Sequence, residues 1–175
     1  RAVSMSSLHI SIRHEAWATS RFNTQVLKDA FAKSNHVVLV FSVTRTSHYQ
    51  GYARMVSAPD KDLLPGLWGN LSTVLGDTFR VKWLKQCMLP VHQGDVLRTD
   101  VKLSVPLRKS RDGQEIPLPV GEAMLRMMHQ QKQEDLLALP GELSFRGARE
   151  ASDAAYESQH RARSRSRDRN RSPSR

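Results

Sequence analysis

Apolar and polar positions recur with different periods along the chain, and these periods predict its secondary structure. Residues 1–12 alternate weakly around LHISI, which is typical of a strand at a sheet edge. From Asn23, a residue type that often caps helices, the period changes to that of a helix. The apolar face of this predicted helix consists of Val26, Leu27, Ala30 and Phe31.

The middle of the chain has the pattern of strands. Residues 36–43 are a nearly continuous β-branched and aromatic run, which predicts a buried strand. Residues 49–56 predict a second strand, and the polar turn at 45–47 pairs the two as a hairpin. Gly51 inside the second strand indicates a bulge or a close backbone approach. Residues 78–84 alternate cleanly and place Phe79, Val81 and Trp83 on one face.

The remaining segments define the expected domain organisation. Residues 57–77 form a long Pro- and Gly-rich loop, and such loops are often functional. A short alternating segment contains Leu103, Val105 and Leu107, and a helix opened by Pro119 carries an apolar stripe of Ala123, Met124, Met127 and Met128. We expect one domain over residues 1–135, a weakly helical linker over 136–160 and a disordered Arg/Ser-rich tail over 161–175.

Charge adds a partner to this picture. The formal net charge of the 175 residues is +10, and seven Arg and one Asp in residues 161–175 contribute +6 of it. A mildly basic domain with a strongly basic tail favours a polyanionic partner. The single cysteine excludes a disulfide within the chain and a cysteine zinc site. No apolar run approaches the ~20 residues of a membrane span, so we expect no membrane partner, and we expect a monomer.

The three tryptophans fall into two kinds of surroundings. Trp83 continues a strand face and is expected in the core. Trp17 in HEAWATS and Trp68 in PGLWGN lie in polar or Gly-rich segments without a clear period. One interpretation is that both rings cover the edges of the core. The other is that they converge to clamp a flat ligand such as a nucleobase, for which stacking contributes ~1–3 kcal/mol per base.

The sequence offers no pattern of an enzyme. Its seven histidines have no metal-ligand spacing, and neither a Gly-rich phosphate loop nor a nucleophile elbow is present. Asp112 and Glu115 flank Gly113, which is typical of a turn. We therefore expect no catalytic residue, no metal and no cofactor.

Three stretches together resemble one family. VLVFSVTRTSHYQGYARM, FRVKWLKQCMLP and above all SRDGQEI are similar to the YTH domain, the reader of N6-methyladenosine in RNA, and the resemblance covers roughly residues 8–128. It implies an α+β fold, with a small β-barrel of about six strands surrounded by helices. It also implies an aromatic cage that encloses the methylated adenine.

The resemblance assigns roles to particular residues. Trp17, in a W-A-T motif, matches the first cage tryptophan, Trp68 the second, and Leu75 in VLGDTF the third wall. Ala18 would offer backbone groups to the edge of the base. Arg108, Lys109 and Arg111 would bind phosphate.

The start of the chain departs from the family pattern. Family members begin with a strand of the RFFxxKS type and an Asn-rich turn whose asparagines read the adenine edge. Here the stretch is RAVSMSS, with Ser7 where one Asn would fall. We expect that the first barrel strand is missing, as in a truncated domain or an alternative gene model. A lost base-edge donor would cost ~1–3 kcal/mol of binding if its partner stays unpaired.

The expected function is recognition of N6-methylated mRNA as a single strand, because a base inside a helix cannot enter a cage. The Arg/Ser-rich tail resembles those of nuclear splicing factors, so we expect a nuclear protein of mRNA processing or splicing, with RS-domain splicing factors and kinases as partners. The alternative is a nuclear adaptor that binds RNA through its tail alone, independently of methylation and with a steep salt dependence. An RNA-modifying enzyme would need a general base or metal ligands near the cage.

Overall fold

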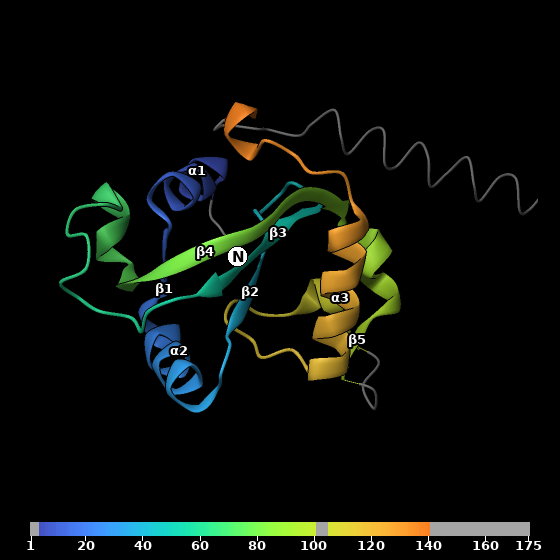
Figure 1. Cartoon of the computed structure of the whole chain (residues 1–175), viewed down its shortest axis with the longest axis horizontal. Helices are drawn as coiled ribbons and strands as arrows, with labels where there is room; N and C mark the ends of the chain where they lie inside the picture. Colours follow the sequence, from blue (N-terminus) through green and yellow to red (C-terminus); the bar gives the residue numbers. More distant parts are fainter. Residues whose placement is uncertain (1–3, 101–104, 141–175) are drawn as a thin grey trace, which may run out of the picture. The chain divides into compact units, whose positions relative to one another are not determined.

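The computed structural model of the chain describes residues 4–100 and 105–140 (Figure 1). Contacts divide the chain into two units, Arg1–Leu143 and Ser144–Arg175, and every described residue belongs to the first. Leu103, the Arg/Ser-rich tail and most of the expected linker lie outside the described residues.

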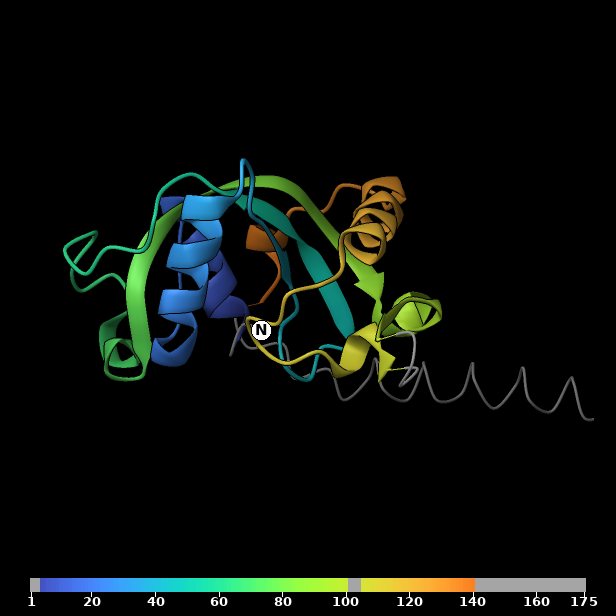
Figure 2. The same ribbon diagram turned by 90° about the horizontal axis from the view of Figure 1, so that it is seen from below.

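The fold class is α+β, as predicted. A four-stranded antiparallel sheet has the order β1-β4-β3-β2, and two short strands, β5 and β6, form a separate antiparallel pair. The strands are β1 Ala16–Ser20, β2 Val38–Phe41, β3 His48–Met55, β4 Leu75–Pro90, β5 Arg98–Asp100 and β6 Val105–Pro106. Figure 2 shows that β4 bends strongly along its length, so that the sheet forms an arch. The described strands are thus divided between two sheets, and β1 and β2 are the edges of the larger one.

Helices flank both ends of the arch. Helices α1 and α2 lie toward the β1 end, and α3 lies toward the end of β4 (Figures 1 and 2). The α-helices are α1 Met5–His14, α2 Arg21–Lys33 and α3 Leu118–Gln130, and the 3-10 helices are η1 Gly69–Thr73, η2 Val91–Val96, η3 Leu107–Lys109 and η4 Leu136–Ala138.

The predicted hairpin is confirmed, and so is the special role of its glycine. Strands β2 and β3 pair antiparallel, with Phe41 opposite Gly51. Gly51 has φ +142°, and a Cβ built on it would lie 2.1 Å from the backbone oxygen of Lys85 on β4. The register between β3 and β4 also shifts at this point, between Tyr49 and Gly51. Gly51 therefore combines a bulge with a close backbone approach.

The prediction of a strand in residues 1–12 is wrong, because α1 occupies most of this segment. Ser4 caps the helix: its side-chain oxygen accepts a hydrogen bond from the backbone N–H of Ser7 at 3.3 Å. Met5, Leu8 and Ser11 are buried at a spacing of three residues, which is the period of a helix face. The alternation in LHISI matched both periods over a short window, so it could not separate them.

Two further boundaries differ from the prediction. Helix α2 begins at Arg21 rather than Asn23, and Val26 is 50% exposed while Leu27 is buried. Strand β4 begins at Leu75 and ends at Pro90, so it contains the end of the predicted loop and extends past residue 84. The predicted strand face is nevertheless correct, because Phe79 and Val81 are buried and Trp83 packs against the same core.

Two clusters of buried side chains form the core. The first cluster contains residues of α1, of the four-stranded sheet and of η4. In the second, α3 packs against the first half of β3 and the last residues of β4. Met124 and Met128 of the predicted stripe are fully buried in the second cluster. Leu136 is fully buried in the first, and its carbonyl lies 2.8 Å from Nε2 of His9. The packed domain therefore continues past residue 135.

Candidate functional site

Trp17 and Trp68 meet in the folded chain, although about 50 residues separate them in the sequence. Their ring centroids are 5.5 Å apart and their planes are at 84°. Trp17 also stands edge-on to Phe41, at 5.0 Å and 90°. Because the two tryptophan rings are perpendicular, they cannot be the two parallel faces of a clamp.

Strand β1 explains the position of Trp17. Residues Ala16–Ser20, which have no clear sequence period, pair antiparallel with β4 and are covered on both faces. Trp17 lies opposite Phe79, and Ala18 lies opposite Thr78. A strand buried on both faces shows no alternation of apolar and polar residues, so β1 could not be recognised from its period.

A bulge interrupts this pairing directly after Ala18. The next pair is Ser20 with Leu75, so β4 places Gly76 and Asp77 opposite the single residue between Ala18 and Ser20. Bulges disrupt the ladder locally and redirect side chains, and they are frequent beside binding sites. Leu75 is the first paired residue of β4 on the other side of this bulge.

Trp68 is held by a hydrogen bond to the same strand. Its Nε1–H donates to the hydroxyl oxygen of Thr78 at 3.2 Å, in buried surroundings. The segment that carries Trp68 is also tied to β4 further back, where the N–H of Asp60 donates to the carbonyl of Thr78 at 2.8 Å. Thr78 is a site residue that the sequence analysis missed, because nothing in the pattern distinguishes it from other strand threonines.

A cavity of about 670 Å³, the α2 cavity, opens between α2, the segment before η1 and the start of β4. Trp68 and Leu75 both line it, and Trp17 lies behind Trp68. Its lining residues are Arg21, Thr24, Gln25, Lys61, Leu63, Leu64, Pro65, Gly66, Trp68, Ser72, Leu75, Gly76, Asp77 and Thr78. A volume of this size accommodates a small organic group such as a nucleoside.

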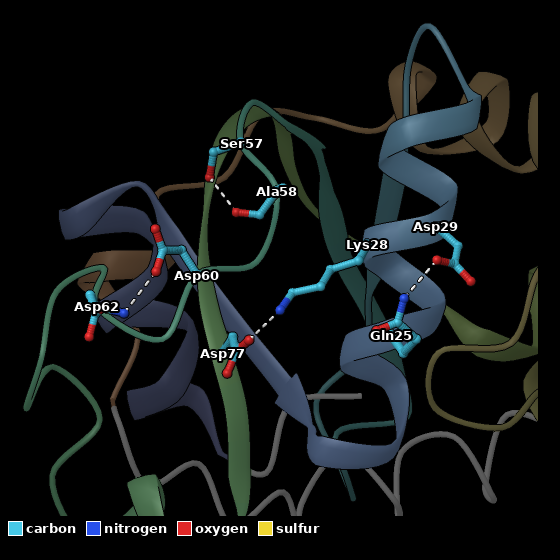
Figure 3. Close-up of polar contacts among 8 residues, drawn as sticks. All are labelled: Gln25, Lys28, Asp29, Ser57, Ala58, Asp60, Asp62 and Asp77. Atoms are coloured by element: carbon cyan, nitrogen blue, oxygen red, sulfur yellow. Dashed lines mark hydrogen bonds and ion pairs between the residues drawn. The ribbon is translucent and has the colours of Figure 1, made fainter.

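An ion pair fixes the helix wall of the α2 cavity. Figure 3 shows Lys28 of α2 extending to Asp77 of β4, with Nζ 2.7 Å from the carboxylate oxygen Oδ2. On the opposite wall, the side chain of Asp60 accepts a hydrogen bond from the N–H of Asp62 at 2.9 Å (Figure 3). This bond shapes the turn that leads toward Trp68. A contact between elements thus ties α2 to β4 beside the cavity, and a local hydrogen bond shapes the turn before Trp68.

The SRDGQE loop, residues 110–115, docks on the junction of β1 and α2. The carboxylate of Asp112 accepts hydrogen bonds from the Thr19 hydroxyl and from Nδ2 of Asn23, each at 3.2 Å. Gly113 has φ +68°, and a Cβ there would lie 2.5 Å from the Asn23 side chain. The predicted turn is confirmed, but Asn23 lies inside α2 and does not cap it, since the N-cap is Ser20. The hydrogen bonds of Asp112 hold the loop that carries Arg111 against β1 and α2.

The expected phosphate-binding residues have different surroundings. Arg108, Lys109 and Arg111 are all exposed at the end of η3 and the start of the SRDGQE loop. Arg108 forms an ion pair with Asp95, and its side chain is 44% exposed. The backbone N–H of Arg111 donates to Oε1 of Gln114 at 2.9 Å, which orders the loop around it.

Ser7 lies apart from these contacts. It is buried in α1, where its N–H is bonded to the capping oxygen of Ser4. Cys87 is also buried, and burial raises the pKa of its thiol, so it is not a candidate nucleophile. Among the described residues, no cluster of His, Cys, Asp and Glu could hold a metal ion. No helix within the described ranges is long and apolar enough to cross a membrane.

Aromatic rings beside an open cavity, with cationic side chains nearby, are typical of domains that bind single-stranded nucleic acid. Residues 1–129 match the YT521-B-like domain family, YTH. The chain is 43% identical to the Toxoplasma CPSF4 YTH domain, solved in complex with a 7 mer m6A-modified RNA, with a TM-score of 0.74 over 79% of this chain and 93% of that one. It is 25% identical to the Pho92 YTH domain, solved in complex with m6A, with a TM-score of 0.72 over 78% and 87% of the two chains.

The chain therefore belongs to the YTH family. A curated relative, the 30-kDa cleavage and polyadenylation specificity factor 30 of Arabidopsis thaliana, is 35% identical over 135 residues, which are 76% of this chain. These residues are 21% of that relative, so the chain spans about a fifth of the length of the curated proteins that it matches.

Proposed function

We propose that this chain binds single-stranded RNA and recognises N6-methyladenosine through Trp17, Trp68 and Leu75. The observation that carries the proposal is the perpendicular contact between Trp17 and Trp68, of which Trp68 lines the α2 cavity together with Leu75. It is supported by the two related domains that were solved with m6A or m6A-modified RNA. One relative is 43% identical over most of the domain, which makes a shared ligand the simplest expectation.

Because the two tryptophan rings are at nearly a right angle, each would contact a different part of the base. A flat purine that stacks on one tryptophan meets the other with its edge, because the ring planes are at 84°. The methyl group lies on that edge, so one ring would hold the base and the other would contact the methyl group. Leu75 completes the apolar surface from β4. Backbone groups of Ala18, next to the β4 bulge, are the proposed partners of the base edge.

Entry of a base requires a local shift. Trp17 is 9% exposed and Trp68 6% exposed, so neither ring presents a free face of the size of a purine. Leu67 and Leu71 pack against the same cluster and flank Trp68 along the chain. We infer that side chains between Lys61 and Leu75 move when the base enters. This segment consists of turns and one short 3-10 helix, whose rearrangement disturbs no strand.

Discrimination needs more than burial of one methyl group. That burial is worth ~0.8 kcal/mol, which is a factor of about four. An unmethylated amine also loses a hydrogen-bonded water when it enters an apolar cage, and this cost adds to the difference. Both effects act only when the cage is dry, so the proposal requires the tryptophans and Leu75 to exclude water together.

The basic residues would bind the RNA backbone and supply affinity without sequence information. Arg111 and Lys109 are the proposed principal phosphate ligands. Arg108 is already paired with Asp95, so its contribution would be smaller. The Arg/Ser-rich tail would add non-specific attraction that salt weakens.

We further propose that the protein acts in nuclear mRNA processing. Support comes from the Arabidopsis thaliana relative, whose name assigns it to cleavage and polyadenylation. The tail, with four serines and a charge of +6 in residues 161–175, would connect the domain to splicing factors and kinases. Each phosphate would add about −1.5 to −2, so phosphorylation of all four serines would reverse the sign of the tail.

The experiment compares equivalent tryptophan substitutions inside and outside the site. Trp17→Leu and Trp68→Leu keep apolar bulk but remove the aromatic face. Trp83→Leu is the matched control, since Trp83 packs on Phe41 and does not line the α2 cavity. Affinities for methylated and unmethylated RNA are measured after each variant is confirmed as folded. We expect the methylation preference to fall in the first two variants and to persist in the third. A methylation preference that stays at the wild-type value in all three variants would contradict the proposed cage.

A further inference from the structure

Phe22 is the most exposed large apolar side chain among the described residues, at 92%. It is the second residue of α2, and the core-facing side of that helix is formed instead by Leu27 and Phe31. Phe22 therefore contributes nothing to the core. Its ring gains no free energy from burial, and its position beside the proposed site makes the ring available to a bound ligand.

The two neighbours of Phe22 in the sequence connect it to both parts of that site. Arg21 lines the α2 cavity, and its Nε donates to the carbonyl of Leu75 at 3.4 Å. Asn23 holds the SRDGQE loop through hydrogen bonds from Nδ2 to the carbonyl and the carboxylate of Asp112, both at 3.2 Å. Phe22 thus lies between the cavity wall and the loop that carries Arg111.

We propose that Phe22 stacks on the base that neighbours the methylated adenosine in the same RNA strand. This inference rests on the proposed function and adds a second base-binding position to it. Phe22 lies two residues after Ser20, the strand partner of Leu75, so its Cα is at most about 7.6 Å from that of Ser20. An RNA strand that leaves the α2 cavity toward Arg111 would therefore pass Phe22 with the nucleotide next to the methylated adenosine.

The local charge favours RNA over an apolar protein partner as the occupant. Arg21 precedes Phe22, and Arg111 adjoins the loop residue that Asn23 holds. Both are exposed cations, and an exposed ring between cations suits a base that is flanked by phosphates. Every base has a π face, so the stack tolerates any nucleotide and would add affinity rather than sequence preference.

The test combines protein variants with modified RNAs, at a salt concentration that suppresses binding by the basic tail. Phe22→Ala and Phe22→Trp are compared with Val26→Ala, which removes a half-exposed side chain one turn further along the same helix face. Each is titrated with methylated RNA that is intact, or that has an abasic site immediately 5′ or 3′ of the methylated adenosine. Phe22 is exposed, so its variants should keep the thermal midpoint of the wild type.

We expect Phe22→Ala to weaken binding of the intact RNA about fivefold or more, and Phe22→Trp and Val26→Ala to bind as the wild type does. The abasic site on one side should weaken the wild type by a similar factor and leave no further effect of Phe22→Ala, because the two changes remove the same contact. Unchanged binding by Phe22→Ala, or a loss that persists on both abasic RNAs, overturns the stacking role.

The same titrations separate this inference from the function on which it rests. Phe22→Ala should keep the wild-type ratio of affinities for methylated and unmethylated RNA, because Phe22 does not touch the methyl group. A wild-type protein without methylation preference overturns the proposed cage. A wild type with that preference, combined with no effect of Phe22→Ala, overturns the stacking role alone.

Discussion

Thr78 accepts a hydrogen bond from the indole nitrogen of Trp68 at 3.2 Å and lies opposite Ala18 in the pairing of β1 with β4. The side chain of Thr78 in β4 therefore holds the ring of Trp68, which comes from the segment before η1. It does so beside β1, the strand that carries Trp17. The hydrogen bond ties the segment of Trp68 to β4 opposite β1, and we expect it to help set the angle between the two tryptophan rings.

Replacement of Thr78 by Val should loosen Trp68 without changing the shape of β4. The buried indole N–H would lose its acceptor, which costs about 1–2 kcal/mol of stability. The methylation preference should also fall, because Trp68 would no longer be fixed relative to Trp17. Denaturant unfolding and RNA titration measure the two effects. Thr73→Val, at an exposed threonine of η1, is the control, and an equal effect of both substitutions would argue against a special role of Thr78.

Removal of the Asp112 carboxylate should release the SRDGQE loop. Asp112→Ala deletes the acceptor shared by Thr19 and Asn23. Because Asp112 is exposed, the stability cost should be small, about 1 kcal/mol. RNA affinity should fall by the same factor for methylated and unmethylated RNA, because the proposed role of the loop is to bind the RNA backbone and not the methylated base. Asp29→Ala, an exposed aspartate of α2 that accepts a bond from Gln25, should change neither quantity.

The basic residues should contribute unequally to the salt dependence of binding. Arg111→Ala should reduce the slope of log affinity against log salt by about 0.7, the value for one phosphate contact of a single strand. Arg108→Ala should reduce it less, because Asp95 already neutralises part of this charge. Equal slopes for the two variants would mean that the ion pair does not persist in the RNA complex.

Gly51→Ala should be among the most damaging substitutions in the described chain. Its Cβ would lie 2.1 Å from the Lys85 backbone oxygen, and φ is +142°. We expect a loss above about 3 kcal/mol, measured by urea unfolding. Gly66→Ala separates the two causes, because Gly66 also has positive φ, +78°, but has open space around it. Its cost should stay near 1 kcal/mol. A similar cost at both positions would show that the β3–β4 contact is not tight.

The elements whose period was distinctive could be predicted from the sequence. The hairpin of β2 and β3, the Gly51 bulge and the Met stripe of α3 agree with the structure. Helix α1 could not be recognised, because LHISI fits two periods. Strand β1 was missed since both of its faces are covered, and alternation appears only when one face meets water.

Part of the candidate site could also be predicted from the sequence. Trp17, Trp68 and Leu75 were assigned by resemblance, and the structure brings the two tryptophans together and lines the α2 cavity with Trp68 and Leu75. The angle between the rings and the Thr78 hydrogen bond depend on how distant segments pack. Such contacts leave no periodic signal in the sequence. The supporting role of Asn23 was hidden because its residue type also suits a helix cap.

The most direct test is the affinity of the unmodified chain for one single-stranded RNA, with and without an N6-methyl group on one adenine, at a salt concentration that suppresses the tail. The proposed cage predicts at least tenfold tighter binding of the methylated RNA, equivalent to about 1.4 kcal/mol. Equal affinities that fall together as salt rises would contradict it, and would leave basic side chains as the source of RNA binding.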